Sequence, residues 1–282
     1  MIRTALPAPL HLPGTGRWPL LLSIPHAGTD YPSWLLCNAR SGRPSLEPLE
    51  DPLTDRLAWR AMALGVGAVI AQTPRAAIDC NRGPTEMLLA NEPLAPDHEP
   101  GPRARGGLGL VPTRTQRHGE LWYQEPSVAE IERRKDAAWM PYHQLVAGQL
   151  MLLQRRHGEV LLLDVHSMPA RHATLPRLVI GNRHGGTSAA WLSDLARRTA
   201  EEAGFRTGFN DPYAGGYIVE RHGQPAEGIH ALQLELDRAS YLAPSLRTPG
   251  PGFNSVTRLL ESLCQVLGDA LLMRNAALEA AE

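Results

Sequence analysis

Two histidines of this chain stand where buried strands are expected to end, and the active sites of open α/β sheets lie at such strand ends. His26 follows the apolar run 20–24, and His166 ends a second apolar run. Because side chains alternate between the two faces of a strand, Asp164 points to the same side as His166. Neutral imidazole is the commonest zinc ligand in catalytic sites, which typically join three protein ligands to an open position for water. The histidines therefore predict two ligands of a catalytic metal.

Carboxylates are expected to complete such a site. The nearest acids to His26 in the sequence are Asp30 and, at the start of an expected helix, Asp55. Glu235 lies between two leucines in another apolar segment, where a buried carboxylate is unfavourable without a partner. A metal-bound water supplies such a partner, and a raised pKa suits Glu235 as a general base. Taken alone, Glu235 could equally be a salt-bridged strand residue.

A candidate for substrate binding is the pair Asn81 and Arg82, which is followed directly by Gly-Pro. The guanidinium of an arginine presents a planar fork of donors that matches the two oxygens of a carboxylate. The pair therefore suits a clamp on a substrate carboxylate, although it could also cap a turn.

The short motifs of other enzyme classes are absent from the sequence. It contains no GxSxG elbow of serine hydrolases, no GxxxxGK[ST] phosphate loop and no HExxH zinc helix. It also lacks the GxGxxG turn of dinucleotide-binding domains. These absences leave a strand-end metal site as the favoured chemistry.

The composition is that of an ordinary globular protein, with 43% hydrophobic and 20% charged residues. A net charge of −1 gives no electrostatic reason to expect nucleic acid or a membrane surface as partner. Three widely spaced cysteines, Cys37, Cys80 and Cys264, argue against a disulfide framework or a thiolate zinc site. The start of the chain lacks the apolar core of a signal peptide. We expect a cytoplasmic protein that acts on a small molecule.

The elements that position these residues alternate between strands and helices. Strands are expected at 20–24, 65–71, 160–165, 177–181, 215–219 and 229–236, and helices at 53–64, 128–156, 188–203 and 255–280. Prolines and glycines predict a loop excursion at about 84–119. The alternation predicts a single α/β domain over 1–282, a three-layer sandwich around a mixed, mostly parallel sheet.

Six short segments, taken together and in order, resemble the N-formylglutamate amidohydrolase (N-formylglutamate deformylase) family. They lie at 23–29, 54–57, 79–82, 164–167, 215–218 and 235–236. The resemblance implies a zinc-carboxypeptidase-like (phosphorylase/hydrolase-like) fold that holds Zn²⁺ or another divalent metal. It also implies hydrolysis of N-formyl-L-glutamate to formate and L-glutamate, a step of histidine degradation.

The resemblance further assigns roles to individual residues. It implies His26 and His166 as metal ligands, Glu235 as the base, and Asn81 with Arg82 as the carboxylate clamp. The carboxypeptidase pattern places an acid three residues after its first histidine, where this sequence has Thr29. More distant relatives of the family keep an acid at the position of Asp55, so the resemblance implies Asp55 as the acidic ligand, with Asp30 as the alternate. Arg183 or Arg221 would bind the side-chain carboxylate of the substrate.

Three alternatives stay open at this point, of which a metal-storage or sensor role is the least favoured, because such sites are usually closed by more ligands, often cysteine. A carboxypeptidase-like enzyme, or another hydrolase of N-acyl amino acids or peptides, would use the same catalytic residues on a different substrate. The segments expected to shape the pocket, at 84–119 and 178–187, resemble the family only loosely. A non-catalytic module that binds a small molecule would keep the fold but bind no metal.

Overall fold

The computed structural model describes residues 5–87 and 101–280, and contacts between residues divide them into two compact units. The first unit consists of residues 5–10, 25–50, 70–87 and 101–144. The second unit consists of residues 11–24, 51–69 and 145–280. The segments of the two units alternate along the chain. The single domain expected over 1–282 stays a prediction.

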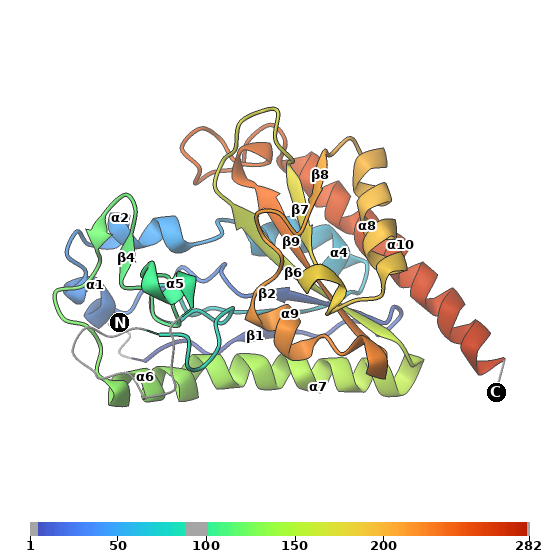
Figure 1. Cartoon of the computed structure of the whole chain (residues 1–282), viewed down its shortest axis with the longest axis horizontal. Coiled ribbons are helices and arrows are strands. Elements are labelled where there is room, and N and C mark those ends of the chain that lie inside the picture. Colours follow the sequence, from blue (N-terminus) through green and yellow to red (C-terminus); the bar gives the residue numbers. More distant parts are fainter. Residues whose placement is uncertain (1–4, 88–100, 281–282) are drawn as a thin grey trace. The chain divides into compact units, whose positions relative to one another are not determined.

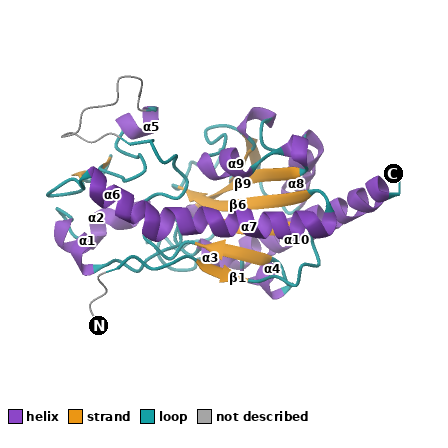
Figure 2. Cartoon of the chain, turned by 90° about the horizontal axis from the view of Figure 1, so that it is seen from below, coloured by secondary structure: helices purple, strands orange, loops and turns teal. Residues whose placement is uncertain are grey.

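The second unit is built on a seven-stranded sheet with the strand order β1-β3-β2-β6-β9-β7-β8. Its strands are β1 (Leu10–Leu12), β2 (Leu20–Ile24), β3 (Gly67–Ile70), β6 (Val160–Met168), β7 (Leu178–Gly181), β8 (Thr207–Phe209) and β9 (Ile229–Asp237). Strand β6 pairs in parallel with both β2 and β9, whereas β7 is antiparallel to β9. The sheet is therefore mixed and mostly parallel, as predicted, and β6 and β9 run side by side in Figure 2.

The central strands are buried on both faces because helices cover them. All residues of β2 and β6 are buried, as is typical of parallel strands between two helical layers. The helices of this unit are α3 (Thr54–Leu57), α4 (Trp59–Ala63), the larger part of α7 (Met140–His157), α8 (Ala190–Glu202), α9 (Tyr217–His222) and α10 (Phe253–Glu279), with 3₁₀ turns at Arg183–Gly185, Pro225–Glu227 and Arg238–Ser240. Helix α10 contacts α3, α4 and α8, and α8 and α10 lie side by side in Figure 1.

The first unit is built from short elements around a small apolar core. These are α1 (Ser33–Asn38), α2 (Arg43–Leu46), a 3₁₀ turn at Glu47–Leu49, α5 (Pro102–Arg105), the hairpin of β4 (Arg114–Thr115) and β5 (Gly119–Glu120), and α6 (Val128–Arg134). Its core contains Leu35, Leu46, Leu49 and Trp122. The predicted excursion at 84–119 is thus partly regular, and its portion at 88–100 lies outside the described residues.

The long helix predicted at 128–156 is confirmed with one irregularity. Helix α6 continues through a π-helical segment, Lys135–Trp139, into α7 (Met140–His157). The helix predicted at 53–64 is instead the pair α3 and α4, which are separated at Ala58. Among the described residues, no helix combines the length and the apolar composition that crossing a membrane requires.

The strand predicted at 215–219 is wrong, because this segment contains a turn followed by α9. The β-branched pair Ile218 and Val219 does favour a strand by local preference. Gly215 has a φ of +117°, which redirects the chain before an extended run can form. Both β-branched side chains are buried, and α9 contacts β6 and β9. Tertiary packing therefore overrides the local preference.

Candidate metal centre

His166 lies near the carboxyl end of β6 and is held by a carboxylate two residues earlier on the same face. Its Nε2 atom is 2.7 Å from Oδ2 of Asp164. The hydroxyl of Ser23, on the neighbouring strand β2, donates to Oδ1 of Asp164 at 2.6 Å. All three side chains are buried. Since a carboxylate only accepts hydrogen bonds when ionised, Asp164 places the imidazole proton on Nε2 and leaves Nδ1 as the ligand atom.

The Nδ1 atom of His166 lies beside a second buried carboxylate, that of Asp51. Their separation is 3.2 Å, measured to Oδ2 of Asp51. The other oxygen, Oδ1, accepts a hydrogen bond of 2.9 Å from Nη2 of Arg238. Arg238 is in turn held by the hydroxyl of Ser167, which accepts from its Nε atom at 3.0 Å. Asp51 is therefore fixed at one oxygen and presents the other to His166.

The electrostatics around His166 favour a positive charge at this position. Burial by itself lowers the pKa of His166, but the nearby carboxylates, Asp164 first and then Asp51, raise it well above its usual value. Glu235 adds to this effect through its charge. A site that stabilises an imidazolium among carboxylates also stabilises a bound cation.

Glu235 lies opposite His166 in the register of β6 and β9. Its side chain is 8% exposed, so it is nearly buried while still reaching solvent. Its Oε1 atom accepts a hydrogen bond of 2.9 Å from Nε2 of Gln233, two residues earlier on the same face of β9. The sheet thus places the expected base and one expected ligand on adjacent strands.

His26 has an equivalent carboxylate partner within the first unit. Its Nε2 atom lies 2.7 Å from Oδ1 of Asp79, and both side chains are buried. Arg75 donates to Oδ2 of Asp79 at 2.7 Å, and the backbone N–H of Asn81 donates to Oδ1 at 2.7 Å.

This environment keeps Asp79 ionised. Burial raises the pKa of Asp79, but the charges of Arg75 and then His26 lower it well below its usual value. An ionised Asp79 fixes the imidazole proton of His26 on Nε2, as Asp164 does for His166.

Three buried side chains, those of His26, Asp51 and His166, could hold a metal ion. Each offers one ligand atom, and these atoms all lie within 4.8 Å of one another. Two imidazoles and one carboxylate are a donor set typical of catalytic zinc, which keeps a further position open. The carboxylates behind both imidazoles complete the outer shell that such ligands need. The residues present therefore fit a divalent metal.

The acid in this group is Asp51, which differs from the sequence-based expectation. Asp55 is half-buried in the first turn of α3, and Asp30 is exposed. Neither belongs to the group that could hold a metal. The carboxylates Asp79 and Asp164 were also not assigned a role from the sequence, although the alternation along β6 had placed Asp164 beside His166.

The expected carboxylate clamp lies in the first unit, where Asn81 and Arg82 are both buried. Arg82 donates from Nε to the carbonyl of Leu108 at 2.8 Å and from Nη1 to that of Asn81 at 2.7 Å. Burial lowers the pKa of Arg82 to about 10, so it stays cationic at neutral pH. Its Nη2 atom has no hydrogen-bond partner among residues 5–87 and 101–280.

The two arginines expected to bind a second substrate carboxylate lie in the second unit and are more exposed than Arg82. Arg183 pairs with Glu220 at 2.7 Å, and both side chains are over 40% exposed, at 41% and 51%. Arg221 donates to the hydroxyl of Tyr217 at 2.9 Å. Such exposed contacts contribute little to stability.

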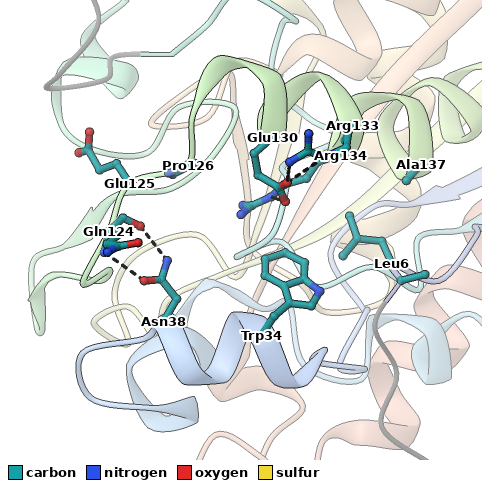
Figure 3. Close-up of a pocket in the computed structure, with 11 residues that line it drawn as sticks. Leu6, Trp34, Asn38, Gln124, Glu125, Pro126, Glu130, Arg133, Arg134 and Ala137 are labelled. Carbon is teal, nitrogen blue, oxygen red and sulfur yellow. Dashed lines mark hydrogen bonds and ion pairs between the residues drawn. The ribbon is translucent and has the colours of Figure 1, made fainter.

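A separate hollow of about 550 Å³ lies in the first unit and is shown in Figure 3. Trp34 forms part of its wall, with the guanidinium of Arg134 at 4.7 Å from the ring centroid. Glu130 accepts hydrogen bonds from Arg133 and Arg134 along the same wall. None of the residues predicted for the reaction lines this hollow, so we assign no chemistry to it.

Comparisons with known proteins point to one family. The model of the family "N-formylglutamate amidohydrolase" matches residues 18–242. An N-formylglutamate deformylase of Pseudomonas putida is 32% identical over 236 residues, which is 80% of this chain and 83% of the relative. One of Pseudomonas aeruginosa is 30% identical over 246 residues, with the same coverage of 80% and 83%.

Solved structures agree with this result. The crystal structure of N-formylglutamate amidohydrolase from Ralstonia eutropha JMP134 superposes with a TM-score of 0.85 at 29% identity, covering 93% of this chain and 98% of that one. A gene product of Agrobacterium tumefaciens shares the fold at 17% identity and a TM-score of 0.65, covering 95% and 94%. With a family model that spans residues 18–242 and relatives of at least 30% identity, this chain belongs to the N-formylglutamate amidohydrolase family.

Proposed function

We propose that this protein hydrolyses N-formyl-L-glutamate to formate and L-glutamate, with a divalent metal held by His26, Asp51 and His166. The observation that carries the proposal is the buried group of two imidazoles and one carboxylate. Its donor set favours zinc. The names of the Pseudomonas relatives support the substrate.

The protein's own residues supply the proton transfers of this reaction. A bound metal would polarise the formyl oxygen and make a water molecule more acidic. Glu235 takes a proton from the water as the water oxygen bonds to the formyl carbon. Glu235 then gives that proton to the amide nitrogen as the carbon–nitrogen bond breaks. Formate and glutamate leave, with the second proton of the water passing to the amine, and the carboxylate of Glu235 is restored.

In this proposal, cationic side chains orient the substrate by binding its two carboxylates. We assign the α-carboxylate to Arg82, whose Nη2 atom makes no hydrogen bond to the described part of the chain, with Asn81 beside it. Arg183 or Arg221 would bind the side-chain carboxylate. Binding of both substrate carboxylates would hold the formamide in one place relative to Glu235. Such positioning of the reacting groups raises the rate of the reaction.

Release of the free amino group from a panel of substrates tests the proposal, because hydrolysis of each compound on the panel frees an amine. The panel contains N-formyl-L-glutamate, N-formyl-L-glutamine, N-acetyl-L-glutamate and a glutamyl dipeptide, each with chelated and with zinc-reloaded protein. We expect release from N-formyl-L-glutamate with the highest kcat/KM, and only after reloading. Faster cleavage of the dipeptide or the acetyl compound would instead identify another acyl-amino-acid hydrolase. Equal activity after complete metal removal would contradict the metal site.

A further inference from the structure

The side-chain amide of Gln233 connects a glycine-rich turn to the expected base. Gln233 and Glu235 lie on the same face of β9, and Gln233 is 2% exposed. The Nε2 atom of Gln233 donates to Oε1 of Glu235 at 2.9 Å. The backbone N–H of Gly216 donates to Oε1 of Gln233 at 2.8 Å. Because an amide accepts only through its oxygen, the Gly216 bond fixes the end of Gln233 that faces Glu235.

The turn that carries Gly216 packs closely against the sheet, and this close approach is possible because Gly181 has no side chain. A β-carbon on Gly181 would lie 2.7 Å from both the carbonyl carbon of Ala214 and the nitrogen of Gly215. Gly181 is paired with Gln233 in the register of β7 and β9, so the turn lies over that part of the sheet. The backbone N–H of Arg183 also donates to the carbonyl of Ala214 at 2.6 Å.

We propose that Gln233 is a positioning residue for Glu235, and that the turn at 214–216 acts through it. The inference rests on the proposed function, in which Glu235 is the base. A terminal carboxylate rotates freely about its last torsion unless its oxygens are bound. The bond from Gln233 holds Oε1, and the carboxylate plane therefore keeps one orientation for proton transfer. Gln233 itself transfers no proton.

The substitution Gln233→Met in metal-loaded enzyme tests this role, because methionine keeps the side-chain length but donates no hydrogen bond. We expect kcat for N-formyl-L-glutamate to fall about 10- to 100-fold, the effect of a misplaced catalytic group. KM should stay within about twofold and metal content should not change, since Gln233 is neither clamp nor ligand. The matched control is Gln154→Met, which removes only a contact to the carbonyl of Glu227 and should keep wild-type kcat. A wild-type kcat in Gln233→Met would overturn the proposal.

The background Glu235→Gln distinguishes positioning from a general structural effect. If Gln233 acts through Glu235, adding Gln233→Met to this background should lower the residual kcat by less than about twofold. An equal loss in both backgrounds would overturn the inference and leave the proposed function intact. Wild-type kcat in Glu235→Gln alone would overturn both.

A second variant covers the case in which Gln233→Met fails to fold, as judged by circular dichroism and Tm. Gln233→Glu keeps the volume and the acceptor for Gly216, but it presents an oxygen to Glu235 in place of the N–H. The same 10- to 100-fold loss of kcat at unchanged KM is expected. Full activity in a folded Gln233→Glu variant would count against the positioning role.

Discussion

The Nδ1 atom of His166 lies 3.2 Å from Oδ2 of Asp51. Two ligands bound tetrahedrally to one zinc ion at about 2.0–2.1 Å each are separated by roughly 3.3 Å. The distance between these two atoms therefore fits two ligands of one zinc ion, and it also fits a hydrogen bond. Arg238 fixes the far oxygen of Asp51, so the near oxygen is held in place for either use.

The first prediction concerns which acid binds the metal. Asp51→Asn should lower zinc affinity at least about 100-fold, because a neutral amide replaces a charged ligand, while its oxygen can still accept from Arg238. The control is Asp55→Asn, which should bind zinc as the wild type does. Competition with a chromophoric chelator measures both affinities. Loss of zinc in Asp55→Asn with retention in Asp51→Asn would restore the sequence-based assignment.

The second prediction concerns the carboxylate behind His166. Asp164→Asn should lower zinc affinity about 10- to 100-fold, the usual effect of losing such an outer-shell partner. The new amide can donate to Nε2 of His166, which would place the imidazole proton on Nδ1, where the metal should bind. Asp194→Asn, an exposed change on α8, is the control and should leave the affinity unchanged. The same chelator competition applies, and equal affinities would show that Asp164 plays no such part.

The third prediction concerns the turn that lies over Gly181. Gly181→Ala adds a β-carbon within 2.7 Å of the backbone at 214–215, so the turn must shift and release Gln233. We expect kcat to fall about tenfold or more at constant metal content. Gly148→Ala is the control, because a β-carbon there meets nothing within 4 Å and alanine favours the helix by up to about 1 kcal/mol. Steady-state kinetics of both variants, with metal analysis, provide the test.

The fourth prediction concerns stability at low pH. Burial, reinforced by the charge of Arg221, lowers the pKa of His222 to about 4. The unfolded chain, with a histidine pKa near 6.5, therefore binds a proton that the folded protein does not bind between these values. The stability due to neutral His222 is present above pH 6.5 and is lost as the pH falls towards 4.

Urea unfolding of metal-free protein at pH 7.5 and pH 5 measures this loss. His222 should contribute about 2 kcal/mol to the decrease in the free energy of unfolding over that interval. His222→Gln does not titrate, so its free energy of unfolding should fall by about that much less than the wild type's. Identical pH dependence in the two proteins would show that His222 titrates normally.

Much of the fold could be predicted because the central strands are fully buried. The runs 20–22 and 160–163 in β2 and β6 are apolar on both faces, and such runs are recognisable without knowledge of the neighbouring strands, whereas β9 carries Gln233 and Glu235 on one face. The polar residues that interrupt or follow these runs, His26, His166 and Glu235, were therefore found from the sequence. Their burial in the structure agrees with the expectation.

The proposed acidic ligand, Asp51, could not be predicted in the same way. Asp51 lies in an irregular segment between a 3₁₀ turn and α3, with Glu47 and Glu50 close by, so no periodicity distinguishes one acid from another. Its carboxylate accepts a hydrogen bond from Arg238, which lies 187 residues later in the chain. Asp79 poses the same difficulty, since its link to His26 spans 53 residues. A contact of this kind is a property of the tertiary structure.

The kcat of metal-loaded Glu235→Gln for N-formyl-L-glutamate tests the central claim most directly. The variant keeps the size of the side chain and leaves the proposed ligands in place, so zinc occupancy measured beside the assay should equal that of the wild type. Loss of a general base typically reduces the rate 10²- to 10⁴-fold, and we expect a fall in kcat of that order. A kcat equal to the wild type's at full zinc occupancy would contradict the mechanism.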